Sequence, residues 1–259
     1  MSRGRTVLFT AKVLAAVASA ALTVGLALTS AKTWQPADRT VLGLAATAAT
    51  LALVTSTSQA WTDHRGRRQR QLHEHVATHL RAAFWNVHDA THEQIDPKDL
   101  GVAVYLLAWD RPRLRGLRPY WRPRRLQRLH RDRPRHHNES TGLVWRPGKG
   151  VIGACVAHAG IAHCDLSAAW GPHLQATEAQ WAALDPRVTQ GLAYREFRSL
   201  VDGGKRLGVV VASPILRDGR AVGCVAVDGP PGAAAYELLR AQRVKDSLAD
   251  TAAAVGMLV

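Results

Sequence analysis

The sequence predicts an α+β fold, with an antiparallel sheet flanked by helices, preceded by two N-terminal transmembrane helices. Two long apolar stretches without charge open the chain. Near the C-terminus, two β-branched stretches are joined by four residues that include Asp218 and Gly219, which is typical of a β-hairpin. Several other segments have the three- and four-residue apolar spacing of helices. The expected order of helix, strand, strand, helices, hairpin and helix indicates an α+β domain.

The N-terminal apolar stretches predict a transmembrane helical hairpin within residues 1–62. Residues 13–31 and 40–62 contain no charged side chain. At about 1.5 Å per residue, each stretch is long enough to cross a bilayer core of roughly 30 Å. The link between them contains Pro36, which favours a short turn. No ionisable residue lies inside either stretch, so an anchor is favoured over a transport path.

Basic residues on both sides of this hairpin predict its orientation. They are Arg3, Arg5 and Lys12 before the first stretch, and Arg65, Arg67, Arg68 and Arg70 after the second. Because such flanks stay on the cytoplasmic side, we expect a multi-pass protein of the cell membrane whose soluble domain lies in the cytoplasm. A cleavable signal peptide is the alternative for the first stretch. It would leave the second span and the location of the soluble domain unchanged.

Residues 63–95 predict a linker or signalling helix. Its apolar stripe consists of Leu72, Val76, Leu80, Ala83, Phe84 and Val87. The stripe can pair with a second copy of the chain, which would give a homodimer, or pack on the domain that follows. His75 and His79 have a spacing that can bind a metal from one helix face, but no third ligand is evident, so no metal site is predicted.

Residues 96–259 predict the soluble domain. Its expected elements are a strand over 101–109, an edge strand with exposed arginines over 125–131, a helix over 177–201 that is interrupted by a proline, the C-terminal hairpin, and a helix that starts near Ala233. The antiparallel sheet of this domain is expected to be covered by the helices.

An arginine-rich segment accounts for most of the net charge of +14. Residues 111–135 hold eleven arginines and one acid, interleaved with Tyr120 and Trp121. Such a segment suits anionic lipid or nucleic-acid phosphate. Because the domain is tethered close to the bilayer, lipid is the nearer polyanion and nucleic acid is not expected as a partner. The candidate membrane-surface residues are Arg122, Arg124, Arg125 and Arg128, and a solvated loop is the alternative.

Three sequence segments resemble GAF domains. They are PGKGVIGACV at 147–156, GVVVASPIL at 208–216 and GRAVGCVAVDGP at 219–230, within a match over roughly residues 72–255. The resemblance implies a PAS-like sensory fold, a ligand pocket between the sheet and the middle helices, and often dimerisation. The cyclic-nucleotide motif of the family is missing, which disfavours cyclic GMP. Cys155 is not followed directly by histidine, which disfavours a covalent chromophore.

The resemblance also implies which residues line the pocket. The candidates are Tyr105, Trp145, Cys155, Asp165, Trp170, Tyr194, Arg195 and Glu196. Aromatic residues supply apolar walls with a polar tip, and Arg195 or Asp165 is suited to fix one charged group of a small ligand. As an alternative, Trp145 and Trp170 simply complete the core, and Arg195 pairs with Glu196 or Asp202. The ligand and any cofactor are not identified.

Enzymatic signatures are weak or missing. Gly148, Gly150 and Gly153 spell GxGxxG, but no acid follows at the distance a dinucleotide site needs. Three cysteines exclude a disulfide-based scaffold and four-cysteine zinc sites. A metal or haem site near His163 and Cys164 is the minor alternative to buried thiols. We therefore expect a non-enzymatic, membrane-anchored sensor that signals through protein contacts. The alternative is a ligand-triggered effector whose hairpins permeabilise the bilayer.

Overall fold

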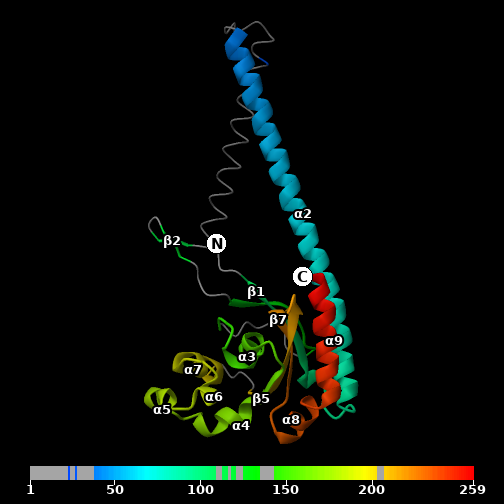
Figure 1. The fold of residues 1–259 in the computed structure, drawn as a ribbon, viewed down its shortest axis with the longest axis vertical. Helices are drawn as coiled ribbons and strands as arrows, with labels where there is room; N and C mark the ends of the chain where they lie inside the picture. Colours follow the sequence, from blue (N-terminus) through cyan, green and yellow to red (C-terminus); the bar gives the residue numbers. More distant parts are fainter. Residues whose placement is uncertain are drawn as a thin grey trace. The chain divides into compact units, whose positions relative to one another are not determined.

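The computed structural model describes most of the chain from Asp38 onward (Figure 1). The described residues belong to two compact units, Met1–Arg70 and Gln71–Val259. They are Thr23, Ala27, 38–108, 113–115, 118–120, 125–134, 143–202 and 207–259.

The described part of the first unit is mainly the N-terminal portion of helix α2 (Asp38–Ala90). The second of the two expected spans, residues 40–62, is helical. The first, residues 13–31, lies outside the described residues except for Thr23 and Ala27. Among the helices of the described ranges, none combines the length and apolar character needed to cross a bilayer. The two-span anchor stays a prediction from the sequence.

The second unit contains a five-stranded antiparallel sheet flanked by helices, which confirms the α+β prediction. The strand order is β4-β1-β7-β6-β5, and every neighbouring pair is antiparallel (Figure 1). The strands are β1 (Gly101–Ala108), β4 (Arg125–Asp132), β5 (Ala162–Asp165), β6 (Val209–Arg217) and β7 (Arg220–Gly229). As expected, β4 is an edge strand.

The C-terminal hairpin is confirmed at its turn. β6 and β7 are joined by Asp218 and Gly219 alone, with φ angles of 51° and 72°. Two consecutive positive φ angles define the tight turn whose twist matches that of paired strands. The turn pairs Arg217 with Arg220, and a register shift between Ile215 and Leu216 then brings Val211 opposite Val227. The turn and the register shift together fix which side chains face each side of the sheet.

Helices cover both faces of the sheet. In Figure 1, α9 and α3 lie on opposite sides of it. The helical elements of this unit after α2 are η1 (Pro97–Asp99), α3 (Gly150–His158), α4 (Leu166–Trp170), η2 (Gly171–His173), α5 (Glu178–Ala182), α6 (Pro186–Thr189), α7 (Tyr194–Asp202), α8 (Ala233–Leu239) and α9 (Gln242–Leu258).

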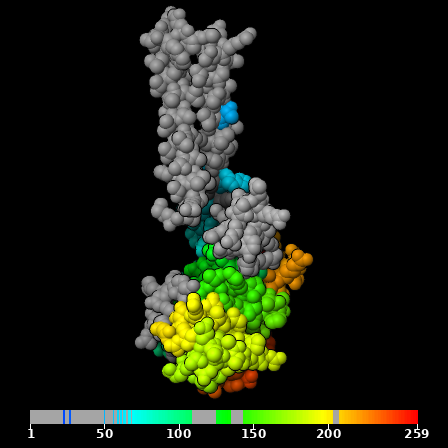
Figure 2. Space-filling view, turned by 90° about the vertical axis from the view of Figure 1, so that its left-hand side faces the viewer, coloured from blue at the N-terminus to red at the C-terminus, as the bar shows by residue number. Residues whose placement is uncertain are grey.

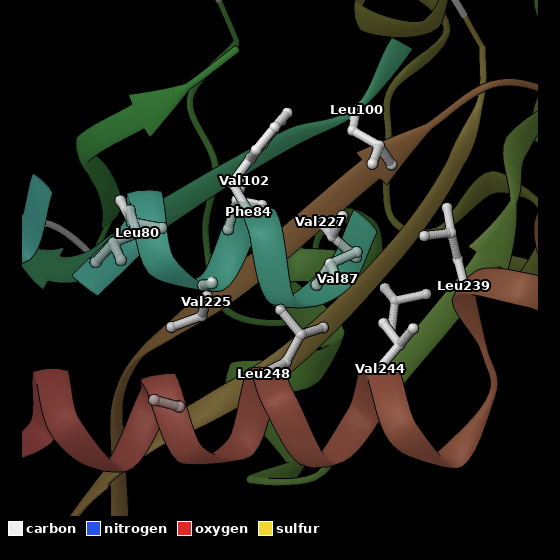
Figure 3. Close-up of a cluster of buried hydrophobic side chains, with 14 of the residues drawn as sticks. Leu80, Phe84, Val87, Leu100, Val102, Val225, Val227, Leu239, Val244 and Leu248 are labelled. Atoms are coloured by element: carbon white, nitrogen blue, oxygen red, sulfur yellow. The ribbon is translucent and has the colours of Figure 1, made fainter. Parts of the chain in front are cut away.

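The main apolar core lies between the sheet, α2 and α9. Figure 3 shows that side chains from these elements point toward one another. Alternate residues of β1 and β7 contribute to it, because successive side chains of a strand point to opposite faces. The buried members labelled in Figure 3 are Leu80, Phe84, Val87, Leu100, Val102, Val225, Val227, Leu239, Val244 and Leu248.

This core resolves the choice left open for the apolar stripe of the linker helix. Val76, Leu80 and Val87 have no exposed surface and belong to the core of the second unit. The stripe thus packs on its own domain. Burying a side chain of this size contributes about 1.5–3 kcal/mol, so residues 76–87 are part of the domain's stability as well as its connection to the N-terminal unit.

The middle segment differs from the single interrupted helix that was expected. Residues 177–201 form three short helices, α5 to α7. Pro186 starts α6 after Asp185 caps it, and Gln190 ends it in a left-handed conformation. Thr177 begins α5 with a capping box whose partner is Gln180. Glutamine fills the third position of such a box as well as glutamate does.

Two small strands also lie in the arginine-rich segment. β2 (Arg113–Arg115) and β3 (Arg118–Tyr120) pair antiparallel as a separate two-stranded sheet. Their residues come from the segment whose sequence predicts a loop or a lipid-binding surface.

Candidate functional site

The face of the sheet that packs against α3, here called the α3 face, carries charged side chains beside an apolar layer. Cys224, Ala226 and Asp228 alternate along β7 and share this face. Arg131 lies opposite Ala103 in the β1–β4 ladder and points the same way. The opposite face of the sheet is lined by valines of the main core. The sheet therefore has one sealed apolar face and one face with buried charge.

Asp228 holds two arginines from the edge of the sheet. Arg131 Nη2 donates to both carboxylate oxygens, at 2.9 and 3.1 Å. Arg133 Nη2 lies 3.3 Å from Asp228 Oδ2. The side chains of Arg131, Arg133 and Asp228 are 16%, 12% and 27% exposed. We call these three residues the arginine–aspartate cluster.

The cluster has more positive charge than negative charge. Two guanidinium groups share a single carboxylate. The Nε atoms of both arginines are buried, and no described residue accepts a hydrogen bond from them. A buried donor on a charged group without an acceptor destabilises the fold by about 1–3 kcal/mol or more. Within the described part of the chain, each arginine therefore keeps one donor without an acceptor.

A glycine makes room for the carboxylate. Gly101 lies opposite Asp228 in the β1–β7 ladder. A Cβ atom at position 101 would be 2.7 Å from Asp228 Oδ1. Because real Cβ atoms do not approach an oxygen so closely, any larger residue would displace the carboxylate and the two arginines bound to it.

Tyr105 lies on the same face of the sheet as the cluster, further along β1 than Gly101. It is half-buried, packs on the α3 layer and lies opposite Cys224 in the β1–β7 ladder. Burial, and then the negative charge of Asp228, raise the pKa of Tyr105 to about 12, although the charges of Arg131 and Arg128 lower it. The hydroxyl is therefore protonated at neutral pH and is able to donate a hydrogen bond.

Helix α3 covers the apolar part of this face. Cys155 on α3 and Cys224 on β7 are fully buried in one cluster with Leu126 and half-buried Trp145. The Trp145 ring lies over the start of the helix, where a Cβ at Gly150 would be 2.6 Å from the ring. Gly150 also has a φ of 62°, so both space and backbone conformation require glycine there. The glycine-rich turn thus seats α3 close to the sheet.

The short helices α4 to α7 have an aromatic core of their own. Trp181 stacks on Phe197 with ring centroids 3.9 Å apart, and Trp170 contacts Phe197 edge-on at 5.8 Å. The indole nitrogens of Trp170 and Trp181 donate to the carbonyl oxygens of Val188 and Leu192. Figure 2 shows the helical segment, coloured yellow-green to yellow, gathered on one face of the unit.

An ion pair joins this helical segment to α3. Lys149 Nζ, just before α3, donates to Glu196 Oε1 at 2.5 Å. Burial raises the pKa of Glu196, but hydrogen bonds from Lys149 and the Ala193 amide, with the charge of Lys149, lower it on balance. The Gly150 amide also donates to the Gln190 carbonyl at 2.8 Å. The start of α3 is therefore held from the side of α6 and α7.

The structure brings only some of the expected pocket residues together. Tyr105, Trp145 and Cys155 meet in the α3 layer. Trp170 is buried in the aromatic core, and Tyr194 packs on it. The remaining three have other positions: Asp165 caps α4 by accepting from the Ser167 and Ala168 amides, Arg195 is exposed on α7, and Glu196 pairs with Lys149.

The structure describes only two of the four expected membrane-surface residues. Arg122 and Arg124 lie outside the described residues. Arg125 is exposed and Arg128 half-buried, and both are on the edge strand β4.

Sequence reasoning missed the arginine–aspartate cluster. A signal was present, because Arg131 and Arg133 are two residues apart and Asp228 interrupts an apolar strand at an inward position. Reading the three as one site requires knowing that β4 and β7 flank β1, which the sequence does not reveal. Separately, no group of three or more metal-ligating side chains comes together within the described ranges.

Comparisons with known proteins give only distant similarities. No family model and no curated protein matches the chain. Among solved structures, the chain is similar to a type II free methionine-R-sulfoxide reductase from Thermoplasma acidophilum, with 13% identity, a TM-score of 0.39, and coverage of 72% of this chain and 94% of the other. It is also similar to the GAF domain of an Acinetobacter phosphoenolpyruvate-protein phosphotransferase, with 11% identity, a TM-score of 0.39, and coverage of 75% and 92%. At such scores these likenesses carry no argument about function.

Proposed function

We propose that this chain is a membrane-anchored regulatory protein whose GAF-like domain binds a small ligand on the α3 face of the sheet and catalyses no reaction. The observation that carries the proposal is the arginine–aspartate cluster, in which the described residues offer no acceptor to the two buried Nε atoms. Convergent polar groups at the border of an apolar layer are typical of small-molecule sites. The sequence resemblance to GAF domains supports a sensory role.

The two faces of β1 and β7 suggest how binding is relayed. Tyr105 and Asp228 face the proposed ligand, whereas Val102 and Val227 on the same strands pack in the core with α2. Packed interiors transmit small displacements because they are close-packed. A shift of these strands on binding would therefore alter the packing of α2, which continues into the N-terminal unit. From there the signal would pass to a partner protein or a second copy of the chain.

The chemistry of the thiols favours binding over nucleophilic catalysis. A hydrogen bond with Cys155, followed by burial, raises the pKa of Cys224 well above its ordinary value. Burial also raises the pKa of Cys164, despite the hydrogen bond from Gln190. Because the thiolate is the reactive form of cysteine, raised pKa values suppress nucleophilic reactivity at neutral pH.

Thermal unfolding of the full-length chain in a neutral detergent tests the proposal. A panel of acidic, basic and neutral metabolites should include at least one compound that raises the midpoint saturably, because a ligand that binds only the folded state stabilises it by mass action. Gly101→Ala, which displaces Asp228, should abolish the rise. Gly171→Ala is the matched control, because nothing lies within 4 Å of its added Cβ. Ligand-dependent stabilisation that survives Gly101→Ala would place the site elsewhere.

The membrane effector stays the alternative prediction. Overexpression of the full chain would be toxic under this alternative, and deletion of residues 13–62 would remove the toxicity. Under the regulatory proposal, expression should be tolerated with or without those residues.

A further inference from the structure

We propose that the ligand is an anion, and that Arg131, Arg133 and Tyr105 bind its carboxylate or phosphate group. This inference rests on the proposed binding function and adds the chemical class of the ligand. It does not follow from the fold, because the same α3 face with neutral side chains would suit an apolar ligand equally well.

The first argument is charge. Arg131 and Arg133 both face Asp228, so the cluster carries one positive charge in excess. A charge removed from water is stable only when it is paired and hydrogen-bonded. An anionic group bound at the cluster would supply the missing negative charge.

The second argument is hydrogen bonding. The Nε atoms of Arg131 and Arg133 are buried donors to which no described residue offers an acceptor, so an anion reaches them only when the side chains shift. Guanidinium groups bind the planar edge of a carboxylate or phosphate through paired donors. Tyr105 lies on the same face of the sheet, and its hydroxyl is a third donor. Three donors and an excess cation select an acceptor-only, negatively charged group and disfavour a cationic or amide ligand.

Asp228 has a positioning role in this site. Its carboxylate accepts hydrogen bonds from Nη2 of Arg131 and forms an ion pair with Nη2 of Arg133, and so helps to orient both guanidinium groups. At the same time its negative charge opposes the binding of an anion. Together these effects predict that the site binds its ligand reversibly and with moderate affinity.

The test uses full-length chain in a neutral detergent, with inorganic phosphate and succinate as probes at constant ionic strength. A probe that binds the cluster should raise the midpoint of thermal unfolding of the chain in a saturable way. Arg133→Gln should weaken this effect by about tenfold or more, because it removes a charged donor from the site. Arg198→Gln is the matched control, since Arg198 is paired with Asp202 on α7, and it should leave the effect unchanged.

A second variant separates a loss of binding from a loss of folding. Arg131→Gln leaves Asp228 paired with Arg133, so one positive and one negative charge remain in the cluster. This variant should therefore fold, and it should bind the probes more weakly than the wild-type chain does because it lacks one charged donor. Arg133→Lys, which keeps the charge but lacks Nε, should also lose affinity.

The probes distinguish two sources of the anionic group. A response to phosphate alone indicates a phosphorylated ligand, a response to succinate alone indicates a carboxylate, and both results support the inference. Equal stabilisation of wild type and Arg133→Gln, or no response to either probe, would overturn it. If the metabolite panel then yields a neutral or basic ligand, the proposed binding function is supported and only the inference that the ligand is an anion is wrong. If the panel yields nothing, both proposals fall.

Discussion

Tyr105 illustrates how one side chain reports on the proposed site. Its ring packs in the α3 layer while its hydroxyl lies within the influence of Asp228 and two arginines. Because Tyr105 lines the proposed site and carries a hydrogen-bond donor, its pKa is sensitive to any change in the charge of the cluster. Its ionisation therefore measures the electrostatics of the site in the absence of ligand.

Alkaline titration should reveal this environment. The pKa of Tyr105 is raised to about 12 from an ordinary value of 10.0, so folding favours the protonated form. The corresponding stability is present below about pH 10 and is lost as the pH rises toward 12. Phenolate absorbance should show a late-titrating component that Tyr105→Phe removes. Tyr236→Phe on α8 is the control and should leave that component in place.

The sequence predicted single residues well where local chemistry decides and poorly where long-range pairing decides. Asp218 and Gly219 specify their turn by themselves. Arg131 and Asp228 are 97 residues apart in the chain and meet only because β1 lies between their strands. Asp165 and Glu196 were expected in the pocket from the resemblance to GAF domains, but their partners hold them as a helix cap and an ion pair.

Helix α3 depends on contacts from outside itself. It has nine residues and no side-chain cap at its N-terminus. Short helices are marginal alone, so packing and the contacts of Lys149 and Gly150 stabilise it. The ion pair between Lys149 and Glu196 is the polar link between α3 and α7.

Removal of the ion pair between Lys149 and Glu196 should change how the stability of the chain depends on acidic pH. The lowered pKa of Glu196 means that its contribution to stability is present above about pH 4.5 and is lost as the pH falls through the lowered value. Glu196→Gln should destabilise the full chain by about 1.5 kcal/mol at neutral pH and flatten its acid response. Asp202→Asn removes the exposed pair with Arg198 and should cost about 0.5 kcal/mol at most. Urea unfolding at several pH values measures both.

The aromatic core should make α4 to α7 a separate cooperative element. Trp181→Ala removes the ring stacked on Phe197 and should destabilise the chain by about 3–5 kcal/mol. Hydrogen exchange should then increase in residues 166–202 before it increases in β6 and β7. Trp85→Ala is the control, because this exposed indole should contribute about 0.5 kcal/mol or less. Simultaneous loss of protection in the sheet would contradict a separate element.

Element prediction succeeded where periodicity was long or the turn chemistry strong. The stripe over residues 72–87 predicted the buried face of α2. By contrast, β5 has four residues, Ala162–Asp165, and no β-branched stretch, so nothing local indicated a strand. It forms because β6 offers an edge with which it pairs.

For the whole molecule, α2 determines where the domain begins. Val76, Leu80 and Phe84 are buried in the main core, although they precede the first strand. A chain of residues 71–259 should therefore fold, whereas residues 96–259 should be largely unfolded. Circular dichroism with thermal melting of the two fragments measures the difference. Cooperative melting of the shorter fragment would show that α2 is dispensable.

Native mass spectrometry of the full-length chain tests the central claim, that the domain binds a small ligand on the α3 face. The chain is purified from cells in a neutral detergent, in parallel with Gly101→Ala and Gly171→Ala. We predict a co-purified small molecule, or one acquired from a metabolite extract, on the wild-type chain and on Gly171→Ala, and its loss on Gly101→Ala, whose Cβ displaces Asp228. An unliganded wild-type mass after exposure to the extract, or equal occupancy in all three chains, would contradict the account.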